Sequence, residues 1–109
     1  MTVQLPIEQV QFDRAGRHLT AYLAGEIDAA ETPEIEKQVL AEHMVDDEQV
    51  WLDLSAVTFC DSSGLGMMLR LHQAVEADGA AFALYDPSPQ VRQLLELTGA
   101  SDTLKVRTS

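Results

Sequence analysis

The chain has 109 residues and a formal net charge of −11, from 18 acidic and 7 basic side chains. We expect one domain over residues 1–109, since a chain of this length buries roughly 65% of its unfolded surface around a single core. Its acidity argues against binding the phosphate backbone of nucleic acids or an anionic membrane surface, because both attract clusters of Lys and Arg. Partners with basic surfaces are favoured instead.

The opening segment carries no recognisable targeting signal. Residues 1–6 lack both a basic start and an apolar signal core, and no apolar run approaches the roughly 20 residues that span a bilayer. A lone cysteine, Cys60, permits no internal disulfide. We therefore expect a soluble, cytoplasmic protein, and nothing in the sequence requires more than a monomer.

A β-hairpin is predicted first. Residues 9–13 and 18–25 alternate in polarity as strands do, and the turn 14–17 contains Gly16, which tolerates a positive φ. A helix follows, with Thr32 as N-cap and Pro33 at its first position. Its predicted buried stripe comprises Ile35, Val39, Leu40 and His43. Residues 46–48 are then predicted to form a solvated acidic turn.

A core strand and a second helix meet in the middle of the chain. Residues 50–60 combine alternation with aromatic and β-branched side chains, which is typical of a buried strand. After Ser62, apolar residues recur at helical spacing until residues 78–79 end the pattern, and Leu71 lies close enough to this stripe to be a core residue. The stripe comprises Leu65, Met68, Leu69, His72 and Val75.

The last third of the chain predicts a strand, a helix and an edge strand. Residues 81–85 form the strand, 86–89 the turn and N-cap, and Gly99 ends the helix. Residues 101–104 add a turn, and residues 104–107 form an edge strand. Because strands separated by helices need crossover connections, the later strands should be parallel, with the hairpin antiparallel. We expect an α/β domain with a small mixed sheet and helices packed against it.

Ser62 is the most informative residue, because it lies between the core strand and the first turn of the second helix. A hydroxyl at this position is exposed, and it faces unpaired backbone N–H groups that can donate hydrogen bonds to an anion. A phosphoryl group would add about −1.5 to −2 charges. Asp61 directly precedes it, and Asp28 ends a predicted strand whose loop could converge on it. This pattern predicts a switch site.

The residues around Ser62 have alternative interpretations. Met67 falls off the predicted stripe and, with Gly66 and Arg70, would border the switch on the outer side of the helix, where a flexible methionine suits a partner surface. The alternative interpretation is that Met67 is an ordinary flanking core residue. Ser62 or Ser63 as a simple N-cap, Asp28 as a turn residue and Asp61 as a capping acid also stay open.

The histidines and the cysteine do not predict a metal centre or a cofactor. His18, His43 and His72 show no metal-ligand spacing with Cys60 or with each other. His72 is expected to be half-buried and hydrogen-bonded. Cys60 is expected to be a small buried residue, although a nearby helix N-terminus could lower its pKa. The glycines at Gly64 and Gly66 are too few for a dinucleotide fingerprint and lack a Walker lysine.

The residues also resemble a known family. Residues 50–69, with Asp-Ser-Ser-Gly-Leu-Gly at 61–66, resemble the phosphorylation loop of STAS domains that serve bacteria as anti-sigma factor antagonists. Leu-Ala-Gly-Glu-Ile-Asp at 23–28 resembles a strand end of that family, and residues 88–99 resemble its last main helix. The resemblance covers nearly the whole chain and implies the same small mixed sheet.

The resemblance implies a partner-switching role. The unmodified protein would bind an anti-sigma factor that is also a GHKL-type serine kinase and so free a sigma factor; phosphorylation would end the binding, and a metal-dependent serine phosphatase would restore it. Ser62 matches the phosphorylated serine, Asp28 the loop aspartate near it, and Asp61 the aspartate before it. Ser63 and Gly64 are its neighbours in the motif. ATP belongs to the kinase, so the chain itself needs no cofactor.

Two other functions remain open. A STAS scaffold in a stressosome or a lipid-transport assembly, without sigma control, would share most of these motifs. A small enzyme with Ser62 or Cys60 as nucleophile would need a base within hydrogen-bond reach, and the sequence offers no nucleophile elbow or paired histidine motif. We therefore expect a binding protein and no catalysis.

Overall fold

The computed structural model describes residues 9–108. Residues 1–8 lie outside the described residues. They include the segment that was predicted to lack a targeting signal. Within residues 9–108, five strands and three helices follow one another in the predicted order, with one 3₁₀ turn near the end. The elements are β1 (Val10–Ala15), β2 (His18–Ile27), α1 (Thr32–Glu42), β3 (Gln49–Cys60), α2 (Ser62–Ala77), β4 (Ala81–Tyr85), α3 (Pro89–Thr98), the 3₁₀ turn (Ala100–Asp102) and β5 (Lys105–Arg107).

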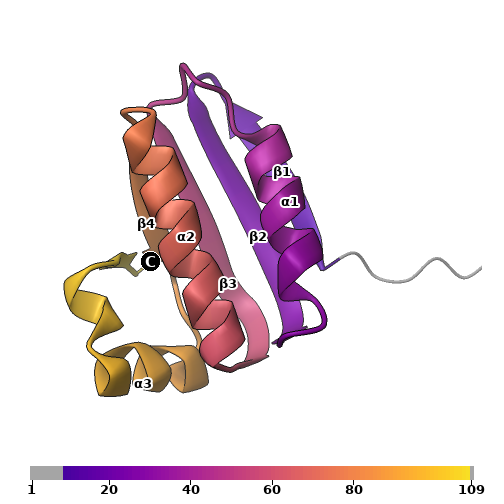
Figure 1. The fold of residues 1–109 in the computed structure, drawn as a ribbon, viewed down its shortest axis with the longest axis vertical. Helices are drawn as coiled ribbons and strands as arrows, with labels where there is room; N and C mark the ends of the chain where they lie inside the picture. Colours follow the sequence, from indigo (N-terminus) through magenta and orange to yellow (C-terminus); the bar gives the residue numbers. More distant parts are fainter. Residues whose placement is uncertain (1–8, 109) are drawn as a thin grey trace, which may run out of the picture.

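The strands form one mixed sheet in the order β1-β2-β3-β4-β5. β1 and β2 are antiparallel, and every later pair is parallel, which confirms the predicted hairpin and crossovers. α1 and α2 lie side by side on one face of the sheet, and α3 lies beyond the end of β4 (Figure 1). The largest fully buried side chains fill the space between sheet and helices: Phe82, Leu19, Leu23, Ile27, Ile35, Leu52, Leu54, Met67, Met68, Leu71, Leu84 and Leu95.

The central strand β3 extends well past its neighbour β4. β4 pairs with it only as far as Asp53, whereas β2 follows it to the pair formed by Ile27 and Cys60. β2 therefore runs two residues beyond the predicted end at residue 25, with register shifts between Tyr22 and Ala24 and between Gly25 and Glu26, and with Gly25 at φ +78°. The ends of β2 and β3 consequently lie next to each other.

The buried face of α2 differs from the predicted stripe. Its residues Gly64, Met67, Met68, Leu71 and Val75 are buried and follow the spacing i, i+3, i+4, i+7 and i+11. The prediction that Met67 lies on the outer side was wrong, since its side chain is 0% exposed. α2 packs against both the sheet and α1, so its buried arc reaches round to Met67. The core position predicted for Leu71 is confirmed.

Two predictions for α1 were also wrong. Glu31 occupies the N-cap position without a side-chain capping bond, and Thr32 is a buried first helical residue. Leu40 is 40% exposed, because α1 faces the core through Ile35 and Val39 and the next residue lies 100° further round the helix.

The acidic turn after α1 contains a buried carboxylate, contrary to the predicted solvated turn. Asp47 is only 4% exposed. It forms an ion pair with Arg14 of the hairpin, lies 3.1 Å from His43 Nδ1, and accepts a hydrogen bond of 2.9 Å from the Met44 N–H. Although burial opposes ionisation, these bonds lower the Asp47 pKa to about 2. His43 Nε2 lies 2.9 Å from Asp78 Oδ2, which links the ends of α1 and α2.

The last elements follow the prediction closely. Gly99 ends α3 with φ +78°, a left-handed conformation that favours glycine. β5 pairs with β4 as a parallel edge strand. Within residues 9–108, no helix has the length and apolar character needed to cross a membrane.

Candidate functional site

Ser62 is the first residue of α2, and it is exposed. Asp61 before it is the N-cap, with its carboxylate accepting hydrogen bonds from the N–H groups of Ser63 (2.9 Å) and Gly64 (3.3 Å). The alternative that a serine caps this helix was therefore wrong, because Asp61 does so. The Ser62 hydroxyl is left at the surface, at the positive end of a helix of 16 residues.

Asp28 and Asp61 are brought together by the paired strand ends. Ile27 and Cys60 face each other in the register of β2 and β3, and each acid is the next residue along its chain. The Asp61 N–H also donates a hydrogen bond of 3.4 Å to the Ile27 carbonyl. Asp28 and Asp61 thus lie at the same end of the sheet, where α2 begins.

A third carboxyl group, from Glu31, adjoins this pair and was missed in the sequence as part of the site. Hydrogen bonding between the side chains of Asp28 and Glu31 lowers the pKa of Asp28 and raises the pKa of Glu31. The Asp28 carboxylate also accepts a bond of 3.0 Å from the Ala30 N–H. Glu31 Oε2 is buried, with no hydrogen-bond partner among residues 9–108. A new negative charge nearby would add to the negative potential of these neighbouring carboxyl groups.

Gly64 lets α2 begin close to the strand ends. A Cβ atom at this position would lie 2.5 Å from Cys60 Sγ and 3.3 Å from the Ile27 carbonyl oxygen, so no larger residue fits without displacing the backbone. Gly64 is buried, and we assign it to packing rather than to partner contact.

Cys60 is buried, as predicted, but the suggestion of a lowered pKa was wrong. Burial, with a smaller effect from Asp61, raises the pKa of its thiol to about 11, so the thiolate nucleophile is scarce at neutral pH. Among residues 9–108, no basic side chain forms a hydrogen bond with the Ser62 hydroxyl. Both observations weigh against the enzyme alternative.

The other predicted neighbours of Ser62 divide between surface and core. Arg70 is exposed, yet it forms a three-bond ion pair with Glu36 of α1, the shortest contact being 2.8 Å. Gly66 is half-buried beside it, and Met67 cannot touch a partner. Phe59, predicted only as part of the core strand, is instead 42% exposed near the end of β3 and offers an apolar contact close to Ser62.

Gln90 of α3 holds the residue at the end of β3. Its side-chain amide accepts a bond of 3.0 Å from the Cys60 N–H and donates one of 3.2 Å to the Cys60 carbonyl. The amide therefore replaces the strand neighbour that β4 no longer supplies at this point. Nothing in the sequence indicates this contact, because a glutamine in the first turn of a helix is ordinary.

Replacing Gln90 by alanine should loosen the strand end that carries Ser62. Losing two hydrogen bonds to buried backbone groups costs about 1–2 kcal/mol, so the Cys60 amide proton should exchange with solvent about five- to thirtyfold faster. Hydrogen exchange followed by NMR measures this rate. Gln93→Ala, at an exposed position of the same helix, should leave the exchange of Cys60 unchanged; equal exchange in both variants would refute the positioning role.

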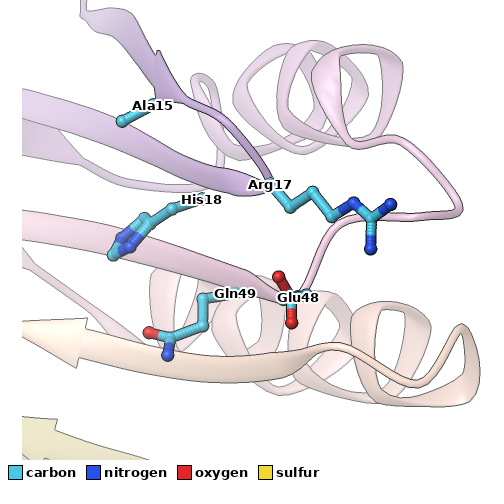
Figure 2. A pocket seen from close by; sticks show the side chains of 5 residues that line it. All are labelled: Ala15, Arg17, His18, Glu48 and Gln49. Atoms are coloured by element: carbon cyan, nitrogen blue, oxygen red, sulfur yellow. The ribbon is translucent and has the colours of Figure 1, made fainter.

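The pocket described for residues 9–108 lies away from Ser62. A pocket of about 190 Å³, lined by residues of the β1–β2 turn and the start of β3, lies at the opposite end of the sheet. It is smaller than the roughly 300–1,000 Å³ of typical small-molecule sites. Arg17 and His18 point in different directions (Figure 2), so its polar groups do not converge. In the part of the chain that the structure describes, no group of three His, Cys, Asp or Glu side chains could hold a metal ion.

Comparison with known proteins places these features in context. A family model described as STAS domain matches residues 9–109. The chain is similar to an anti-sigma-B factor antagonist of Listeria monocytogenes, with 25% identity over 107 residues, covering 98% of this chain and 90% of the relative. The fold is similar to an anti-sigma factor antagonist from Mycobacterium paratuberculosis (TM-score 0.81, 23% identity, 90% and 83% of the two chains). It is also similar to the phosphorylated form of the Bacillus cell fate determinant SpoIIAA (TM-score 0.68, 22% identity, 89% of each chain).

Proposed function

This chain belongs to the STAS domain family, and from that premise we propose that it is an anti-sigma factor antagonist switched off by phosphorylation of Ser62. The unmodified form binds an anti-sigma factor, and a phosphoryl group on Ser62 ends the binding. The observation that carries the proposal is an exposed serine at the N-terminus of α2, directly after Asp61 and at the same end of the sheet as Asp28. The names of its relatives and the phosphorylated form of a structural neighbour support it.

Electrostatic repulsion is the proposed physical cause of the switch. A phosphate of charge −2 placed about 6 Å from one carboxylate of Asp28 or Asp61 is repelled by roughly 1.4–6 kcal/mol, depending on the local dielectric constant. Even the lower figure corresponds to about a tenfold change in an equilibrium constant. A partner whose surface matches the hydroxyl and two carboxylates would therefore be disfavoured by the added charge and bulk.

The switch should act locally, without unfolding α2. The capping bonds at the start of the helix belong to Asp61, so they survive modification of Ser62. The positive end of the helix also favours an anion. The body of α2 remains anchored through its buried face. The protein thus presents the same fold with a different surface charge.

The proposed partners follow from this chemistry. The anti-sigma factor is itself a GHKL-type serine kinase that supplies ATP-dependent phosphorylation, and a metal-dependent serine phosphatase resets the switch. Both enzymes would act in the cytoplasm on this single STAS domain, which binds and performs no catalysis. Since the chain carries a net charge of −11, the kinase surface as a whole should be basic, whereas the part that meets Ser62 should carry no cation that could pair with a phosphate.

Phosphoryl transfer to Ser62 tests the proposal. The purified chain is mixed with candidate anti-sigma factor kinases and ATP, and the modified residue is located by mass spectrometry. We expect one phosphate on Ser62, none in the Ser62→Ala variant, and unchanged modification in the Ser63→Ala variant. Phosphate on Ser63 or elsewhere, with Ser62 free, would contradict the assignment.

A further inference from the structure

The sheet face opposite α1 and α2 carries an aromatic cluster. The rings of Trp51 and Tyr85 stack with centroids 5.2 Å apart at an interplanar angle of 18°, and the His18 ring meets Trp51 edge-on at 4.7 Å. The Arg107 guanidinium lies 5.8 Å from the centroid of the Trp51 ring, a cation–π distance. The cluster therefore draws on four strands: His18 from β2, Trp51 from β3, Tyr85 from β4 and Arg107 from β5. The three rings form its centre, and the cation lies at its margin.

Strand register arranges this face in rows that cross the sheet. One row pairs Thr20, Trp51, Ala83 and Lys105, with Asp13 of β1 at its end. The next row pairs Tyr22, Asp53, Tyr85 and Arg107. Residues paired in this way point to the same face of a sheet. Their neighbours along the strands, such as Leu52 and Leu84, are buried beneath the helices.

Side chains at the two edges of this face are exposed and opposite in charge. Asp13 lies at the β1 edge, and Lys105 and Arg107 lie at the β5 edge. With Asp53, the two rows hold two acids and two bases, so these rows are formally neutral on a chain of charge −11. Tyr22, 44% exposed, leaves apolar surface in contact with solvent. At these two neutral rows a second copy would meet less repulsion than the net charge of −11 produces on average over the surface, and it could cover the exposed part of Tyr22.

We propose that this face binds a second copy of the same chain, about a two-fold axis that runs parallel to β3. Because β3 is the central strand of five, such an axis lays β1 of one copy over β5 of the other, and β2 over β4. Face-to-face sheets commonly pack within about 30° of this alignment. The interface is then isologous, so each contact occurs twice.

The rows of the two copies complement each other under this symmetry. Asp13 of one copy lies opposite Lys105 of the second copy, and Tyr22 lies opposite Tyr85. Trp51, near the axis, meets its own equivalent. Asp53 is turned along its own strand, since its carboxylate accepts bonds from the Ser55 N–H (3.0 Å) and Oγ (2.6 Å), which limits its repulsion of the second Asp53.

The dimer would leave the switch free. α2, which begins at Ser62, lies on the opposite side of the sheet from the proposed interface (Figure 1). One dimer would then present two switch sites to partners. The inference does not depend on what Ser62 binds, and it replaces the monomer expected from the sequence.

A concentration series tests whether the dimer forms through this face. By sedimentation velocity on the full chain, between about 1 μM and about 1 mM, the average mass should rise from that of one chain toward that of two. Tyr22→Lys should weaken self-association at least tenfold. Leu97→Lys, at a 78% exposed apolar position on α3, should match the parent. A single-chain mass throughout, or a Tyr22→Lys variant that associates like the parent, would overturn the proposal.

A charge exchange tests the two-fold arrangement. Asp13→Lys and Lys105→Asp should each weaken self-association at least fivefold, because both edge pairs of the dimer become repulsive. An equimolar mixture of the two variants should regain association close to the parent, since every edge pair between one variant and the other again joins a base to an acid. Rescue by mixing also shows that both variants fold. A mixture that associates no better than the single variants would overturn the arrangement.

Discussion

Replacing Asp47 by alanine is expected to lower the free energy of unfolding by about 3 kcal/mol. Removing one partner of a buried ion pair costs roughly 3–5 kcal/mol, and the Arg14 side chain is 27% exposed, so water would replace part of its lost interaction. His43 and the Met44 N–H would also lose an acceptor. Urea unfolding followed by circular dichroism measures the change, which is a large fraction of the roughly 5–15 kcal/mol typical of a domain.

Asp46 provides the matched control for Asp47. It is exposed in the same turn, so Asp46→Ala should change the free energy of unfolding by no more than about 0.5 kcal/mol. If both variants lost the same free energy of unfolding, the buried contacts of Asp47 would contribute no specific stability.

Acid should remove the same stabilisation. The pKa of Asp47 is depressed from its ordinary value of 3.8 to about 2 in the folded chain, so its contribution is complete above the unfolded value and is lost as the pH falls toward 2. The difference corresponds to about 2 kcal/mol. Between about pH 5 and pH 2, the free energy of unfolding should therefore fall more steeply with decreasing pH for the parent than for Asp47→Ala.

Replacing Ser62 by aspartate is expected to weaken binding to the anti-sigma factor at least about tenfold. The new carboxylate would stand beside Asp61 and Asp28 and would imitate part of the charge of a phosphoryl group. The fold should be unaffected, because an acid in the first turn of a helix interacts favourably with its dipole. Isothermal titration calorimetry with the cognate kinase measures the affinity.

Two further variants separate charge from size in that experiment. Ser62→Asn has nearly the shape of the aspartate without its charge, and Ser62→Ala removes the hydroxyl; both should bind close to the parent. Amide chemical shifts of Ser62→Asp should change only around the start of α2. Widespread shifts would point to a conformational mechanism, and equal binding by Asn and Asp would exclude electrostatic repulsion.

The sequence predicted the order and pairing of elements because those depend on local patterns and on crossover geometry. The strand at 50–60, the helix stop at Gly99 and the exposed serine after the strand need only alternation, φ preference and helix periodicity. Met67 was misplaced for a different reason. Its burial depends on α1 lying beside α2, a tertiary contact that a single-helix stripe does not contain.

The buried polar contacts could not be read from the sequence. Asp47 is one of two adjacent aspartates in an acidic run, and only the fold brings Arg14 of the hairpin to it. Gln90 bonds to Cys60 across 30 residues of chain, and the Asp28–Glu31 pair depends on the loop that follows β2. Interactions of this kind join segments that are distant in the sequence, and local sequence patterns do not show that such segments lie close together.

The central claim is that charge at the start of α2 decides whether a second protein docks. The most direct test is to prepare the chain homogeneously phosphorylated on Ser62 and to compare its affinity for the anti-sigma factor with that of the unmodified chain by calorimetry. We predict at least a tenfold loss on phosphorylation and full recovery after treatment with the phosphatase. Equal affinities for the two forms, with Ser62 carrying the phosphate, would contradict it.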